Sequence, residues 1–195
     1  MYAYLEGKLT FKSPGVVYLD VNGVGYEVNI SLNTYSEIQK LDKTRLYTHF
    51  QVKEDSHTLF GFYDMQEKEI FQYLISVSGV GAATARMMLS SLRPEEVVSA
   101  IVQGNTKVLE NVKGIGKKSA ERLVLELRDK VGKVSGYDHS KVSAGGNTLE
   151  SDALTALVSL GISRSQAETA IKKTMVSTNT VIHLEDLIKQ ALKAI

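Results

Sequence analysis

The sequence contains no cysteine, no tryptophan and only two prolines. Without thiols the chain forms neither disulfides nor thiolate metal sites, which favours a reducing compartment. The four histidines are scattered without metal-ligand spacing, so we expect no metal and no other cofactor. No apolar run approaches the roughly 20 residues of a membrane span. Residues 1–7 lack a basic region followed by an apolar core, so we expect no secretory signal and a cytoplasmic protein without membrane contact.

Neither sign of charge is in large excess, because the net charge is only +1. Residues 64–134 hold eleven Lys and Arg against nine Asp and Glu, whereas residues 1–63 hold six against seven and residues 135–195 six against six. An excess this small cannot by itself drive strong binding to a polyanion. Any nucleic-acid affinity must therefore come from backbone amides with a few placed lysines, or from several copies combined in an oligomer.

A duplicated pattern dominates the middle of the chain. Residues 74–86 return as residues 109–122, thirty-five positions later, with Gly79-Val80-Gly81 matched by Gly114-Ile115-Gly116. Each copy is typical of one helix ending, a tight Gly-apolar-Gly turn and a second helix beginning. This is the helix-hairpin-helix pattern, in which the apolar residue between the glycines is expected to point inward.

Such a turn suits a nucleic-acid phosphate, because glycines admit the anion and a helix N-terminus offers unpaired N–H donors. Backbone contacts of this kind carry no base information, so binding should be independent of sequence. The second copy adds cations, and Arg86 is expected to be the nearest cation to the first copy. We therefore expect the second copy to contribute more affinity. The predicted phosphate-binding residues are Gly79, Gly81, Ala82, Ala83, Gly114, Gly116, Lys117, Lys118 and Arg122.

The sequence offers weaker support for a catalytic role of the same residues. Residues 114–119 resemble a nucleotide-binding P-loop, but that loop requires a glycine where Asn111 stands and a Ser or Thr where Lys118 stands. A helix rather than a strand is also expected to precede them. No carboxylate cluster with nuclease spacing is present. We expect a protein that is not an enzyme.

The fold class expected is multidomain α+β, in four segments. Residues 1–63 predict an OB-type β-barrel, with strands at 2–9, 16–21, 25–30, 45–52 and 58–62 and a short helix at 36–41. Residues 64–132 predict the two helical hairpins, and residues 133–149 a flexible Ser- and Gly-rich linker. Residues 150–195 predict a small three-helix (UBA-like) module, with helices near 151–160, 163–173 and 183–194.

Taken together, these modules resemble the RuvA family, the Holliday-junction-binding subunits of bacterial branch-migration complexes. The resemblance covers all 195 residues and is most specific in the string from Gly114 to Leu123. It implies a homotetramer, singly or as two tetramers, that holds four-way junction DNA open and planar. It also implies RuvB, a hexameric ATPase motor, and RuvC, a resolvase, as partners in recombination, repair and the SOS response.

The resemblance also assigns roles to residues outside the hairpins. Glu54 and Asp55 match an acidic pin that repels phosphates at the crossover. Leu157, Leu160, Gly161 and Ile162 are expected to form an apolar patch that contacts the ATPase. The first hairpin departs from the family, in which a proline and a lysine often follow the second glycine.

Two other functions stay open. The hairpins could serve a repair enzyme beside a nuclease centre, against which the missing carboxylate cluster counts. The barrel could instead bind single-stranded DNA by stacking bases on Tyr18, Tyr26, Tyr47 and Phe50.

Overall fold

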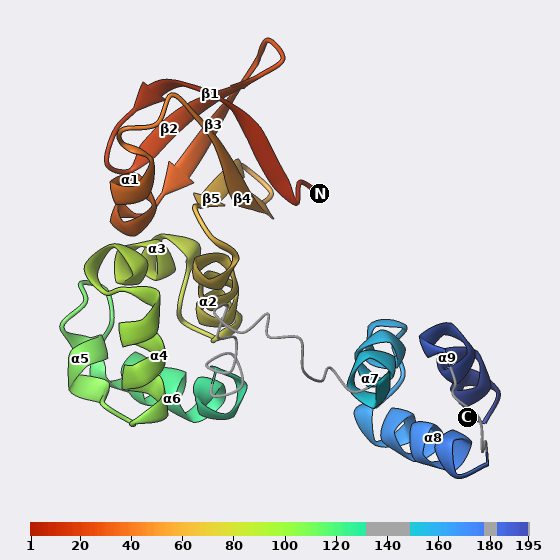
Figure 1. Cartoon of the computed structure of the whole chain (residues 1–195). Helices are drawn as coiled ribbons and strands as arrows, with labels where there is room; N and C mark the ends of the chain where they lie inside the picture. The colour runs from red at the N-terminus through yellow and green to blue at the C-terminus, as the bar shows by residue number, and fades with distance from the viewer. Residues whose placement is uncertain (132–148, 178–182, 195) are drawn as a thin grey trace. The chain divides into compact units, whose positions relative to one another are not determined.

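The structure is a computed structural model that describes residues 1–131, 149–177 and 183–194. These residues form two compact units, one before and one after the predicted linker (Figure 1). Residues 133–148 of that linker lie outside the described residues, and its last residue, Leu149, is the first of a helix.

The first unit begins with a closed five-stranded barrel, which confirms the predicted barrel. Its strands follow the order β1-β2-β3-β5-β4, and β1 pairs with β4 to close the circle. Every pairing is antiparallel except that of β3 with β5. The bounds are β1 (Tyr4–Lys12), β2 (Val16–Val21), β3 (Val24–Ile30), β4 (Lys43–Val52) and β5 (His57–Phe62).

Two local features explain a tight turn of the barrel and the close approach of two of its strands. Asn22 and Gly23 both have positive φ, 52° and 87°, as a two-residue hairpin requires, and the Gly23 N–H donates to Asp20 Oδ1 at 2.9 Å. In β1, a Cβ atom on Gly7 would lie 2.0 Å from the Asp20 carbonyl oxygen. Glycine at position 7 therefore lets β1 approach β2 closely.

The helix that follows β3 starts earlier than predicted. It is α1 (Leu32–Ile38) rather than residues 36–41, because the Ser31 side chain accepts a hydrogen bond from the Thr34 N–H at 3.0 Å. Serine before a helical stretch is an N-cap signal that the sequence prediction overlooked.

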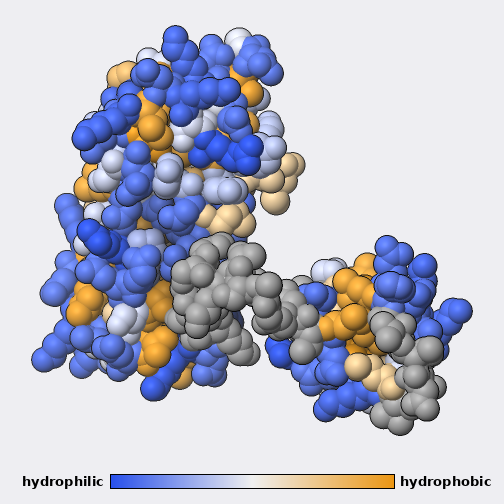
Figure 2. Space-filling view, in the orientation of Figure 1, coloured by the Kyte–Doolittle hydropathy of each residue, from blue (hydrophilic) through white to orange (hydrophobic). Residues whose placement is uncertain are grey.

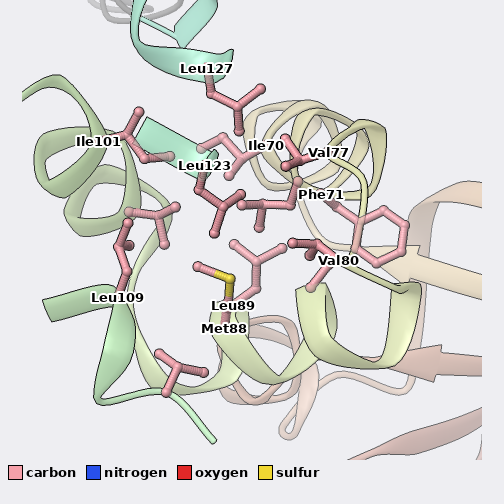
Figure 3. Close-up of a cluster of buried hydrophobic side chains, with 14 of the residues drawn as sticks. Ile70, Phe71, Val77, Val80, Met88, Leu89, Ile101, Leu109, Leu123 and Leu127 are labelled. Carbon is pink, nitrogen blue, oxygen red and sulfur yellow. The ribbon is translucent and has the colours of Figure 1, made fainter. Parts of the chain in front are cut away.

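Five helices complete the first unit and pack around one apolar core (Figure 3). Their hydrophobic residues recur at helical spacing, and Pro94 occupies the first turn of its helix, where a proline is well tolerated. Phe60 and Phe62 of β5 join this core and stack near Phe71, with ring centroids 5.1 and 4.8 Å away. The bounds are α2 (Met65–Ser76), α3 (Ala82–Ser91), α4 (Pro94–Val102), α5 (Thr106–Glu110) and α6 (Lys117–Val131).

The second unit contains the three predicted helices, α7 (Leu149–Ser159), α8 (Arg164–Ser177) and α9 (Leu184–Lys193). Gly161 ends the first of them with φ of 91°, and the Ile162 N–H donates to the Leu157 carbonyl at 3.2 Å, as in a Schellman cap. Its core is small: Ala153, Leu157, Ala167, Ala170, Ile171, Leu187 and Ala191.

Candidate nucleic-acid interface

The first hairpin joins α2 to α3 through a short hydrogen-bonded turn. The Val77 N–H donates to the Leu74 carbonyl at 3.2 Å, and the Val80 N–H donates to the Val77 carbonyl at 3.1 Å. Gly79 between them has φ of 92°, a conformation that favours glycine. Helix α3 then begins with a bond from the Ala85 N–H to the Gly81 carbonyl at 2.9 Å.

The second hairpin, between α5 and α6, repeats this pattern bond for bond. The amides of Val112, Ile115 and Ala120 donate to carbonyls at 3.2, 3.0 and 3.0 Å, and Gly114 has φ of 95°. The residues between the glycines are buried in both copies, with Val80 4% and Ile115 5% exposed. The predicted inward orientation of these two residues is confirmed.

Each hairpin presents unpaired amides at the start of its second helix. The amides of Ala82, Ala83 and Thr84 precede the first helical hydrogen bond of α3, and no side chain caps this end. Residues 117–119 hold the same place in α6 and likewise lack an acceptor within the described part of the chain. A Cβ atom on Gly81 or Gly116 would meet nothing within 4 Å, so the approach to these amides is open. Both ends can therefore accept an anionic oxygen.

The two copies differ in side-chain charge as predicted. Lys117 and Lys118 are exposed in the first turn of α6. The equivalent residues of α3 are Ala82, which is buried, and Ala83, which is exposed. The first hairpin therefore presents only backbone donors from its own first turn.

Arg86, expected to be the nearest cation to the first hairpin, uses one nitrogen of its side chain to bond the barrel. Its Nη1 donates to the Gly15 carbonyl at 3.0 Å and to Asn29 Oδ1 at 2.9 Å, so the side chain reaches the barrel. No local signal in the sequence indicates this contact, because Gly15 and Asn29 lie 71 and 57 residues away. Arg86 fastens α3 to the barrel.

The two hairpins touch each other. A Cβ atom on Gly114 would lie 3.7 Å from Thr84 Cγ2 of the first hairpin. From the other side, Arg122 Nη1 of α6 donates to the Ser78 carbonyl of the first turn at 3.1 Å. The hairpins therefore form one composite surface.

A buried carboxyl group near the start of α2 joins this helix to the barrel. Glu67 is 2% exposed; it accepts hydrogen bonds from the hydroxyls of Ser31 and Thr34, the latter at 2.6 Å. Burial raises the pKa of Glu67 to about 7; the two hydroxyls oppose this rise, and Asp64 adds to it. Asn33 of α1 also donates to the carbonyl of Leu89 at 2.6 Å. Sequence reasoning missed this seam, since a lone Glu in an amphipathic helix is usually exposed.

The predicted acidic pin lies in the turn between β4 and β5. Glu54 and Asp55 are exposed there, and the Lys53 N–H donates to the Ser56 carbonyl at 2.8 Å to close the turn. The two carboxylates belong to the barrel, at a turn separate from either hairpin.

Family models match the barrel, the tandem hairpins and the C-terminal helices. The family model for the RuvA N-terminal domain matches residues 1–61, a SAM-like helix-hairpin-helix tandem matches residues 71–129, and the RuvA C-terminal domain matches residues 148–195. A protein of Christiangramia forsetii is 49% identical over 99% of both chains. One from Cytophaga hutchinsonii is 45% identical over 99% of both chains, and one from Geobacter sulfurreducens is 45% identical over 100% of this chain and 99% of its own. The chain belongs to the RuvA family.

Each of these RuvA relatives bears the name Holliday junction branch migration complex subunit. The family assignment confirms the resemblance drawn from the duplicated turn. It also confirms the α+β architecture of barrel, tandem hairpins and C-terminal helices.

In the segment that matches the RuvA C-terminal domain, the predicted apolar patch is narrower than expected. Leu157 is fully buried in the module's core, so its side chain cannot reach a partner. Ile162 packs against that core, whereas Leu160 is 62% and Val158 44% exposed. Figure 2 shows hydrophobic surface gathered over α7. Leu160 and Val158 lie at the C-terminal end of α7 with Gly161 beside them, and Leu149, Met175 and Leu192 are further exposed apolar residues of this unit.

The described residues lack two kinds of feature. Residues 1–131, 149–177 and 183–194 contain no group of three or more His, Cys, Asp or Glu side chains placed to hold a metal ion. Within the same ranges, no helix is both long and apolar enough to span a lipid bilayer.

Proposed function

We propose that this chain binds four-way junction DNA through its sugar-phosphate backbone, without sequence preference and without catalysis of its own. The observation that supports this most is the pair of matched hairpins, which touch through Thr84 and Arg122 and present two open sets of helix-start amides. Two phosphates of one duplex arm could be held at once by such a surface.

One chain offers a single composite surface, whereas a four-way junction has four arms. We therefore propose that the protein acts as a homotetramer, one chain to each arm, which holds the junction open and planar, alone or with a second tetramer opposite. Combining weak sites in this way raises the overall affinity that the small positive charge of one chain limits. We also propose that the protein acts in the cytoplasm, because the proposed ligand is chromosomal DNA.

Glu54 and Asp55 are proposed to face the crossover, where carboxylates from several chains would repel phosphates and help separate strands. The test is the double variant Glu54→Gln and Asp55→Asn. We expect junction affinity to stay equal or rise while strand separation at the crossover changes, as read from a fluorescent base analogue. A loss of folding in this variant would contradict the proposal.

We further propose that the second unit recruits the ATPase motor RuvB, and that RuvC acts on the same junctions. The support is the exposed Leu160 and Val158 beside Gly161, on a module whose small core leaves apolar surface uncovered. The motor would supply the work of branch migration, and this chain would hold the DNA.

Competition binding tests the proposed function directly. A labelled four-way junction is titrated with the full chain, then challenged with unlabelled junction, duplex and single-stranded DNA of equal length. We expect the junction to compete best by at least about tenfold, because several arms are held together. Equal competition by all three DNAs would refute the proposal, and preference for the single strand would favour the stacking role of the barrel. The mass of the chain with and without junction DNA reports the number of protomers.

Lys117 and Lys118 are tested in the same assay. The double alanine variant is expected to weaken binding equally for unrelated sequences and to lower the salt slope by about two, one for each lost phosphate contact. The matched control is Arg128→Ala with Lys130→Ala, which removes two cations from the last turn of the same helix. An equal loss in both double variants would show a diffuse charge effect and contradict the assignment.

A further inference from the structure

Arg122 lies in the helix of one hairpin and contacts the turn of the other. We infer that Arg122 supplies the cation of the first hairpin's phosphate contact, although its sequence position places it in the second hairpin. This inference rests on the proposed function and assigns a residue within it. The contact that carries it is the 3.1 Å hydrogen bond from Arg122 Nη1 to the Ser78 carbonyl.

Within residues 77–85, which the structure describes in full, the first hairpin's turn and first helical turn carry no cation of their own. Ala82 and Ala83 stand where the second hairpin has Lys117 and Lys118, and Arg86 is bound to the barrel at Gly15 and Asn29. A guanidinium group arriving from α6 fills this gap.

The geometry leaves Arg122 free to contact an anion. A guanidinium group carries five N–H donors, of which one is used at the Ser78 carbonyl. Its Nε lies 3.6 Å from Glu126 Oε1, which holds the stem one turn along the helix. The side chain is 52% exposed, and Ser78 directly precedes Gly79, so the guanidinium group lies beside the first turn and is accessible to solvent.

Helix α3 offers no matching cation to the turn of the second hairpin. Met87 of α3 holds the position in the repeat that Arg122 holds in α6, and Met87 is 44% exposed. A methionine cannot donate a charge to the second turn, but the second hairpin has two lysines of its own. The exchange is therefore one-way: α6 supports both phosphate sites, and α3 supports one.

A double-mutant cycle on the full chain separates the two hairpins. Gly81→Val blocks the amides of the first hairpin and Gly116→Val those of the second, and at both positions a Cβ atom has open space in the free protein. We expect Arg122→Ala alone to weaken junction binding about tenfold and to lower the salt slope by about one. In the Gly81→Val background its further cost should fall below about twofold, because the site it serves is already closed. In the Gly116→Val background the cost should remain about tenfold.

Arg128→Ala on the same helix serves as the charge control in all three backgrounds, and thermal unfolding checks that each variant is folded. The inference is overturned if Arg122→Ala costs the same in the Gly81→Val background as in the parent, if its cost disappears in the Gly116→Val background, or if the salt slope is unchanged. Failure of the parent chain to prefer junction DNA would instead refute the proposed function. The two failures are thus distinguishable.

Discussion

Replacing Glu67 by glutamine should change how the stability of the protein depends on pH. The carboxyl has an ordinary pKa of 4.5 in the unfolded chain, whereas burial raises its pKa to about 7 in the folded one. The folded protein therefore holds an extra proton between these values. The contribution of Glu67 to stability is fully present below pH 4.5 and is lost as the pH rises through 7. The reason is that this carboxyl ionises at a lower pH in the unfolded chain than in the folded one.

The size of the effect follows from the two pKa values. The difference between 7 and 4.5, at about 1.36 kcal/mol for each pKa unit, corresponds to roughly 3 kcal/mol. Glutamine keeps the shape and cannot ionise, and its amide N–H donates to one of the hydroxyls of Ser31 and Thr34, as the O–H of the protonated carboxyl does. The variant therefore mimics the neutral form of Glu67 at every pH.

The assay is urea unfolding of the full chain and of Glu67→Gln between pH 4.5 and 8, at one protein concentration, followed by tyrosine fluorescence and circular dichroism. Other titrating groups cancel in the difference between the two proteins, including His49, whose pKa is lowered by burial and by Lys68. The stability of the wild type relative to the variant should fall by about 3 kcal/mol over this range. A difference that stays constant with pH would refute the reasoning.

Three further predictions concern the hairpins and the second unit. Gly114→Ala should destabilise the protein by about 1 kcal/mol, since residue 114 has φ of 95°, whereas Gly116→Ala should leave stability unchanged and weaken junction binding; equal thermal shifts would contradict this. Arg86→Ala should lower stability by about 2 kcal/mol through its two lost hydrogen bonds to the barrel, with an unchanged salt slope; a reduced slope would return Arg86 to the DNA site. Leu160→Asp should leave junction binding intact and abolish stimulation of the ATPase, read as phosphate release; unaltered stimulation would exclude this residue from the contact.

The duplicated turn shows how far sequence reasoning reaches. Gly79 and Gly114, the buried Val80 and Ile115 and the helix starts could all be predicted, because these features are local: a positive φ, an apolar residue between glycines and unpaired amides within one turn. The barrel could be predicted for the same reason, because strand-forming residues and turn residues such as Asn22-Gly23 are also local signals.

Long-range partners could not be predicted in this way. Nothing near Arg86 in the sequence indicates that its guanidinium bonds Gly15, and nothing near Arg122 indicates that it reaches Ser78, 44 residues earlier. The burial of Glu67 depends on Ser31 and Thr34 of another element. Helical periodicity marks which face of a helix is apolar, but it does not show which polar residue another segment covers.

Strand β5 is a member of two cores at once. Leu59 packs with the barrel, whereas Phe60 and Phe62 pack with the helices around Phe71. A boundary near residue 61, where the match to the N-terminal family model ends, therefore separates homologous segments but not folding units. Helices α2–α6 expressed alone would lose both phenylalanines from their core, and a chimera of two relatives joined there would have to match the whole seam. The barrel and the hairpins are thus expected to be inherited and to unfold together.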